Sequence, residues 1–160
     1  MKRHTALIPL SHQHHDALAL CVFIDRGLRD EPTVENARKL RSQAGDTFAL
    51  LISGHFAVEE SVVFPAVQPH LPDPALIEEL LSEHDSLTSK FKNLANHNDS
   101  ELIAALKDLG AQLDRHIRTE ERILFQTIQE VLDESALVTL GNDIAAEIRA
   151  VCLTSTMQDI

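Results

Sequence analysis

The 160-residue sequence predicts an all-α fold, an antiparallel up-down-up-down four-helix bundle with a short appended C-terminal helix. Its composition favours helix, because Trp and Tyr are absent and only five residues are Gly. Apolar residues recur at spacings of three and four along four long stretches. The connections between these stretches are short, which makes successive helices antiparallel neighbours. With 44% hydrophobic residues, the chain can bury a core, and we expect residues 1–160 to form a single domain.

Turn signals separate the predicted helices. The helices are expected at about 11–29, 34–67, 74–96 and 101–132, followed by a shorter one at about 134–152. Pro65 lies near the end of the second helix and predicts a kink or a frayed last turn there. Asp73 can cap the third helix, with Pro74 at its first position. Gly141-Asn142 is expected to interrupt the fifth helix.

Charge and cysteine content exclude several classes of protein. The formal net charge is −11 and no Lys/Arg cluster could form a basic face, so no nucleic-acid partner is expected. Cys21 and Cys152 lie far apart and form no CxxC pair, which argues against a disulfide framework or a zinc ribbon. The N-terminus lacks the features of a signal peptide, and no apolar run approaches the length of a membrane span. We therefore expect a cytoplasmic protein with no membrane partner.

The strongest feature of the sequence is an internal repeat. The segments HFAVEESVVF and HIRTEERILF begin at His55 and His116 and share the pattern His-apolar-x-x-Glu-Glu-x-β-branched-apolar-Phe. Residues four apart stand on one face of a helix. His55 and Glu59 therefore point the same way, as do His116 and Glu120.

Each His-Glu pair falls on the apolar stripe of its helix. A carboxylate in an apolar core is costly unless it is paired or bound to a metal. Buried His-Glu hydrogen bonds, or helices rotated toward water, are the alternatives, but two matched copies favour a metal. Glu60 and Glu121 follow each pair at about 100° around the helix and are expected at the bundle edge or in solvent.

The other two helices offer further imidazoles. His84 lies on the apolar stripe of the third helix, three residues before Leu87. On the first helix, His14 has the same phase, with Ala17 three residues later. His15 is followed by Asp-Ala-Leu much as His84 is followed by Asp-Ser-Leu, so His15 remains an alternative to His14.

Four histidines and two glutamates suit a pair of metal ions. Glutamates from two helices can bridge two ions, and imidazoles can terminate each of them. Carboxylate bridging favours hard ions, imidazole suits iron, zinc and copper, and iron satisfies both preferences. Zinc, manganese or nickel could occupy the same site as a substitute.

Together these motifs resemble the hemerythrin-like, HHE cation-binding domain family. The resemblance extends from about residue 10 to 132 and is carried by Gln13-His14-His15, His55 to Glu60, Glu83-His84, and His116 to Glu121. It implies a four-helix bundle around two iron ions with an oxo or hydroxo bridge. By matching positions, it implies the ligands His14, His55, Glu59, His84, His116 and Glu120.

One departure from the oxygen-carrying members bears on function. Those members have a second histidine four residues after the third-helix ligand and an aspartate five residues after the fourth-helix histidine. Thr88 and Glu121 stand at these positions here. Thr88 cannot replace a histidine ligand, so one iron should have an open or water-filled position, and reversible oxygen carriage is disfavoured.

Three functions remain open at this point. The first is a diiron module that binds or senses O2, NO or iron status and signals through a protein partner. The second is a diiron enzyme that reduces NO, peroxide or O2, or repairs iron centres. The third is a metal-free structural bundle. The fifth helix either covers the bundle or contacts another subunit in a homo-oligomer.

Overall fold

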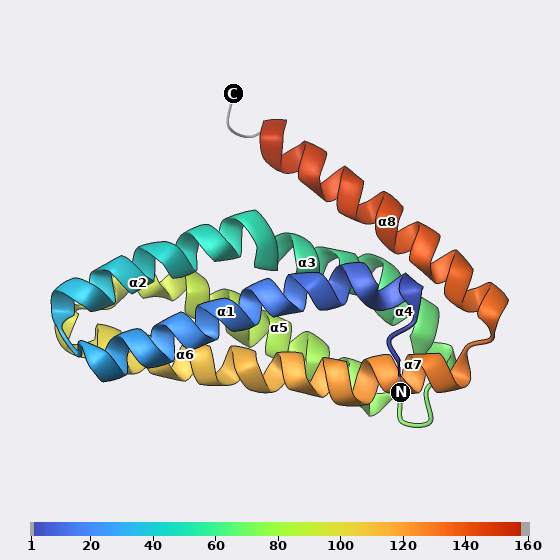
Figure 1. Ribbon diagram of the computed structural model, residues 1–160, viewed down its shortest axis with the longest axis horizontal. Helices are drawn as coiled ribbons and strands as arrows, with labels where there is room; N and C mark the ends of the chain where they lie inside the picture. Colours follow the sequence, from blue (N-terminus) through green and yellow to red (C-terminus); the bar gives the residue numbers. More distant parts are fainter. Residues whose placement is uncertain (1, 158–160) are drawn as a thin grey trace.

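The protein is all-helical throughout the part described by the structure, a computed structural model covering residues 2–157 and the side chains of residues 2–152. Four main helices pack side by side and a further helix follows them (Figure 1). The first comprises η1 (Thr5–Leu7) and α1 (Ile8–Asp30). The second runs from α2 (Val34–Thr47) through η2 (Phe48–Ile52), α3 (Ser53–Val58), η3 (Glu59–Val63), α4 (Phe64–Val67) and η4 (Gln68–His70).

The remaining helices follow after short connections. The third comprises α5 (Ala75–Asn93) and η5 (Leu94–Asn96), and the fourth comprises α6 (Asp99–Thr119), η6 (Glu120–Leu124) and α7 (Phe125–Val131). The further helix is α8 (Glu134–Met157). η2, η3 and η6 are π-helical, whereas η1, η4 and η5 are 3-10 turns.

Side chains in the connections accept hydrogen bonds from amides in the first turns of the third and fourth helices. Asp73 lies one residue before Pro74, which takes the N-cap position of α5. Its carboxylate accepts a hydrogen bond from the amide of Ala75 at 3.0 Å. The Asn98 side chain accepts from the amides of Ser100 and Glu101, so the fourth helix begins at residue 99 rather than 101. These bonds satisfy amides that lack partners in the first helical turn.

The second helix continues through Pro65. The π-helical turn η3 ends at Val63, and Pro65 lies in the first turn of α4. A proline is tolerated at such a start, where its missing N–H costs no α-helical bond. The helix then tightens into the 3-10 turn η4 and ends at Leu71, whose backbone is extended.

The prediction of a short, interrupted fifth helix was wrong. α8 runs for 24 residues and passes through Gly141 without a break. It packs against η1, α3 and η3. A Cβ atom at Gly141 would lie only 2.9 Å from both Cα and Cβ of Ala6. Gly141 thus serves close packing between α8 and η1, and packing outweighs its poor helix propensity.

Two glycine substitutions should therefore have opposite effects on stability. Gly141→Ala would push α8 away from backbone atoms of η1, so we expect a loss of about 1–3 kcal/mol in the free energy of unfolding. Within the part of the chain that the structure describes, a Cβ at Gly45 meets nothing within 4 Å. Gly45→Ala should therefore stabilise the protein by roughly 0.5–1 kcal/mol. Urea unfolding of both variants measures this difference, and a neutral Gly141→Ala would contradict the close contact.

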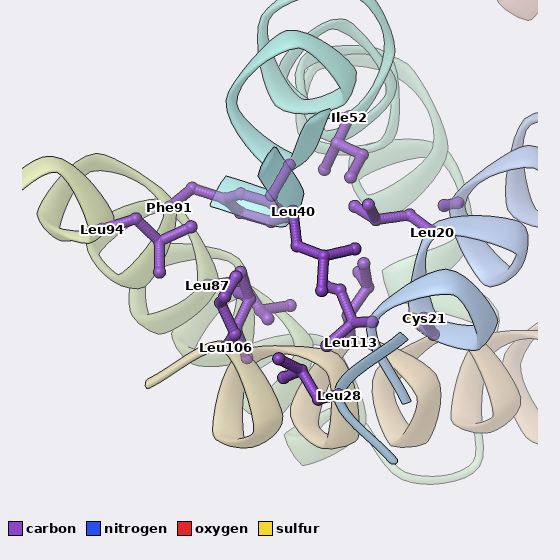
Figure 2. Packing of buried hydrophobic residues seen from close by; sticks show 14 of the residues in the cluster. Leu20, Cys21, Leu28, Leu40, Ile52, Leu87, Phe91, Leu94, Leu106 and Leu113 are labelled. Atoms are coloured by element: carbon purple, nitrogen blue, oxygen red, sulfur yellow. The ribbon is translucent and has the colours of Figure 1, made fainter. Parts of the chain in front are cut away.

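Two apolar clusters fill the bundle, one on each side of a polar layer. The first includes Leu40, Leu87 and Leu113, which point toward one another in Figure 2. It also contains Cys21, and burial raises the pKa of that thiol to about 12. The second cluster includes Phe64 and joins the ends of the main helices to α8. The polar layer between the clusters holds the site described below.

One helix is more apolar than expected from the sequence. Val34–His70 contains an 18-residue window with a mean hydropathy of 1.4, which is long and apolar enough to cross a membrane by length and composition alone. The expectation that no apolar run approaches that length was therefore wrong. This helix carries the buried residues His55 and Glu59, and its α2 part packs against α1 and α6. Its buried apolar residues, which include Ile52, Phe56 and Val58, belong to the core of the bundle, whereas Leu50 is exposed.

Candidate metal centre

Six polar residues are buried in the described part of the chain. Their exposed fractions are at most 4%, and both carboxylates are fully buried. They are His14 on α1, His55 on α3, Glu59 on η3, His84 on α5, His116 on α6 and Glu120 on η6. These are the six residues that the sequence proposes as ligands, and the structure brings them into one layer. His15 is exposed and lies in neither group described next.

The layer contains two overlapping groups of potential metal ligands. Each group combines two imidazoles with the same two carboxylates, and the ligand atoms within a group lie within 4.8 Å of one another. The first position is formed by His14 and His55, and the second position by His84 and His116. Because Glu59 and Glu120 belong to both groups, each carboxylate could bridge two ions.

A closed ring of hydrogen bonds orients the four imidazoles. Each Nδ1 atom lies 2.7–2.8 Å from a side-chain oxygen of an adjacent helix. The pairs are His14 with Glu121, His55 with Gln13, His84 with Glu60, and His116 with Glu83. Every main helix thus supplies one imidazole and one acceptor. Such acceptors fix the proton on Nδ1 and leave Nε2 available to a metal.

The Nε2 atoms face each other in pairs. His14 Nε2 lies 2.8 Å from His55 Nε2, and His84 Nε2 lies 3.1 Å from His116 Nε2. If both Nδ1 atoms of a pair carry protons and both rings are neutral, the lone pairs of the two Nε2 atoms face each other and repel. A proton or a metal ion between the two Nε2 atoms of each pair would remove this repulsion. At separations of 2.8 and 3.1 Å, the two Nε2 atoms of each pair are close enough to ligate one ion together.

The two carboxylates point to the same need for cations. All four oxygens of Glu59 and Glu120 are buried and have no hydrogen-bond partner among the described residues. Imidazole Nε2 atoms approach them at 3.0–3.9 Å without the alignment of a hydrogen bond. Buried charges without partners are unfavourable by several kcal/mol per ion. The donor set therefore fits two hard or borderline metal ions.

Protons supply the positive charge when metal is absent. Burial lowers the pKa of His14, but the neighbouring carboxylates of Glu120 and Glu121 outweigh burial and raise that pKa to about 10. His84 follows the same pattern, with burial opposed by Glu120 and Glu59, and its pKa is also raised to about 10. Burial raises the pKa of Glu59, yet His55 and the other imidazoles hold it well below the usual value. The centre thus keeps both signs of charge at neutral pH.

Metal loading should therefore release protons. A metal ion requires the unprotonated Nε2 of His14 and of His84, so loading both positions at pH 8 should release about two protons per chain. Calorimetry in two buffers of different ionisation enthalpy measures this number directly. An observed binding enthalpy that does not change with the buffer would contradict the raised pKa values.

Glu60 and Glu121 lie at the bundle edge, as expected, with side chains that are 44% and 25% exposed. The sequence did not indicate that their carboxylates accept hydrogen bonds from His84 and His14. Both glutamates follow the first residue of a π-helical turn. A π-helix has more residues per turn, so adjacent side chains are less than 100° apart, and the second glutamate stays beside the site. Glu121 also pairs with Arg3.

Gln13 and Glu83 complete the ring. Each stands one residue before a histidine of the site, in Gln13-His14 and Glu83-His84. The sequence contained this signal, since both acceptors belong to the motifs quoted above, but their pairing with histidines on other helices depends on the packing. Thr88 is half-buried, one turn after His84.

A small cavity adjoins the site. Its volume is about 10 Å³, close to that of one water-sized sphere. Mostly apolar side chains line it, including Leu51, Phe56 and Leu113, together with Gln13 and the site residues His14, His55, His116 and Glu120. The cavity has room for one small molecule beside the imidazoles.

The fold and the buried layer define a helical protein with a His/Glu site suited to cations. The family model of the hemerythrin HHE cation binding domain matches residues 6–128. The chain therefore belongs to this family, as the motifs predicted. α8 lies beyond the matched residues. No curated protein and no solved structure matches the chain.

Proposed function

We propose that this protein binds two iron ions and uses them to bind or sense O2, NO or iron status. One observation carries the proposal: two His2Glu2 groups share two buried carboxylates whose oxygens have no hydrogen bond. His14 and His55 would hold one ion and His84 and His116 the other, with Glu59 and Glu120 shared. Bound iron would supply a Lewis-acidic, redox-active centre.

The chain's own residues define what reaches that centre. The ring acceptors hold the imidazoles, and the two apolar clusters exclude bulk water from both sides. The small cavity beside His55 is about the size of one water molecule, so only a very small ligand could reach the centre from this side. Thr88 stands where oxygen-carrying members have a further histidine, which supports an open position on the ion held by His84 and His116. We therefore favour binding or sensing over oxygen carriage.

A diiron enzyme is the second candidate. The cavity and the open position would allow reduction of NO, peroxide or O2, or repair of iron centres, and Glu121 lies close enough to His14 to hold a proton there. A metal-free structural bundle is the least favoured alternative because, without metal, only protonated imidazoles would balance the two buried carboxylates, whose oxygens accept no aligned hydrogen bond among the described residues. Turnover of NO or peroxide by the loaded protein would separate enzyme from sensor.

The proposal extends to the setting of the protein. We expect it in the cytoplasm, with the main helices in up-down-up-down order and without a nucleic-acid or membrane partner. A sensor would signal through a protein partner or a second copy of the chain. Zinc, manganese or nickel could replace iron in a purified sample.

Anaerobic loading with ferrous iron tests the proposal. After desalting, we expect about two irons per chain, and exposure to air should produce the near-ultraviolet bands of a coupled ferric pair. His55→Ala and His116→Ala should lose these bands, whereas His15→Ala, an exposed neighbour of His14, should keep them. A wild type that retains no iron and does not change its melting temperature with metal would overturn the proposal.

A further inference from the structure

The two halves of the hydrogen-bond ring are built alike. In each half, one acceptor stands one residue before a histidine, at Gln13-His14 and at Glu83-His84. The other acceptor follows its helix's histidine by five residues, at Glu60 after His55 and at Glu121 after His116. Gln13 and Glu83 thus hold equivalent places, but Gln13 is a neutral amide and Glu83 is a carboxylate.

The neutral amide acceptor serves only one of the two metal positions. Gln13 accepts from His55 of the first position, whereas both imidazoles of the second position, His84 and His116, donate to carboxylates. Gln13 is the one neutral acceptor among the four.

The carboxylate that accepts from the other imidazole of the first position has part of its negative charge offset by neighbouring groups. Glu121, which holds His14, accepts from Ser11 at 2.7 Å and pairs with Arg3. The Arg3 guanidinium lies 5.0 Å from the ring centroid of Phe125, and that ring stacks on His14 at 5.3 Å. In the described part of the chain, the acceptors of the second position, Glu60 and Glu83, do not pair with a lysine or an arginine.

A charged acceptor makes an imidazole a stronger donor to a metal. It attracts the Nδ1 proton and thereby raises electron density at Nε2, which an amide oxygen does less well. We propose that Gln13 is a positioning residue that makes the two metal positions unequal, so that the position of His84 and His116 binds a divalent ion more tightly and fills first. This inference rests on the proposed metal centre and adds an order of filling to it.

Cobalt(II) titration of the metal-free protein tests the inference, with calorimetry and visible absorption as readouts. The wild type should bind two ions in two resolved steps. His55→Ala should remove the weaker step and His116→Ala the tighter one. Gln13→Glu keeps the oxygen that accepts from His55 and adds a charge, so it should strengthen the weaker step on the order of ten-fold and merge the two steps.

A reciprocal variant and a control complete the design. Glu83→Gln removes the charge at the equivalent place and should weaken the tighter step by a similar factor. Gln43→Glu makes the same charge change as Gln13→Glu at an exposed site on α2 and should leave both steps unchanged. If Gln13 only holds His55 in place, Gln13→Glu will change neither step nor the cobalt spectrum, and the inference fails. Two equal steps in the wild type would overturn it while leaving the metal centre intact, whereas absence of binding would overturn both.

Discussion

Glu59→Gln should abolish tight loading at both metal positions, although it changes one residue. The Glu59 carboxylate belongs to both ligand groups, and its oxygens approach His55 at 3.2 Å and His84 at 3.5 Å. An amide brings no negative charge and only one ligand oxygen, so each ion would lose a charged ligand. We expect less than one iron per chain after ferrous loading and desalting, against about two in the wild type.

The comparison with His55→Ala separates a bridging role from a local one. His55 belongs only to the first position, so its loss should leave the second position able to bind. Glu35→Gln, on the exposed surface of α2, serves as the matched control and should bind as the wild type does. If Glu59→Gln retains one tightly held iron, the carboxylate serves a single ion and the shared arrangement is wrong.

The metal-free protein should lose stability as the pH rises above neutrality. His14 and His84 have pKa values raised to about 10 in the fold, against an ordinary value of 6.5. Their protonation therefore stabilises the fold fully below pH 6.5, and this contribution is lost progressively as the pH rises toward 10. Because the pKa values of Glu59 and Glu120 are lowered, their contribution is lost in acid instead. The metal-free form should be most stable between about pH 5 and 6.5.

Metal should reverse this trend on the alkaline side. A bound divalent ion replaces the two protons, and at a free concentration of a hundred times Kd it adds about 2.7 kcal/mol per site. For a chain of this size, that gain corresponds to a rise in melting temperature on the order of 5–10 °C per site. Thermal unfolding at pH 6, 7, 8 and 9, with and without zinc, measures the difference, which should widen with pH. A metal-free melting temperature that rises from pH 7 to 9 would contradict this account.

The four main helices and the burial of the six clustered polar residues could be predicted from the sequence because both follow from local periodicity. His14 could be preferred to His15 by its place on an apolar stripe, and the structure buries the first and exposes the second. The repeat beginning at His55 and His116 identified Glu59 and Glu120 for the same reason. A charged residue on a core-facing stripe is informative because burial would otherwise be unfavourable.

The features that the sequence did not predict depend on contacts between distant segments. An α-helical periodicity of 3.6 residues correctly placed Glu60 and Glu121 at the bundle edge, but it could not show that they accept hydrogen bonds from His84 and His14, which lie on other helices. Gly141 was read as an interruption because propensity argues against glycine in a helix, whereas its contact with Ala6 lies 135 positions away in the chain. Helix propensity and periodicity contain no information about such neighbours.

The ring of hydrogen bonds also constrains how the helices can slide past one another. Each main helix carries both a histidine and an acceptor, and these engage two different neighbouring helices. Moving one helix by a single residue along its axis, about 1.5 Å, would misalign both of its links. Apolar stripes alone tolerate such shifts far better, because leucine side chains can repack. The four acceptors thus fix the axial register of the helices before any ion is bound.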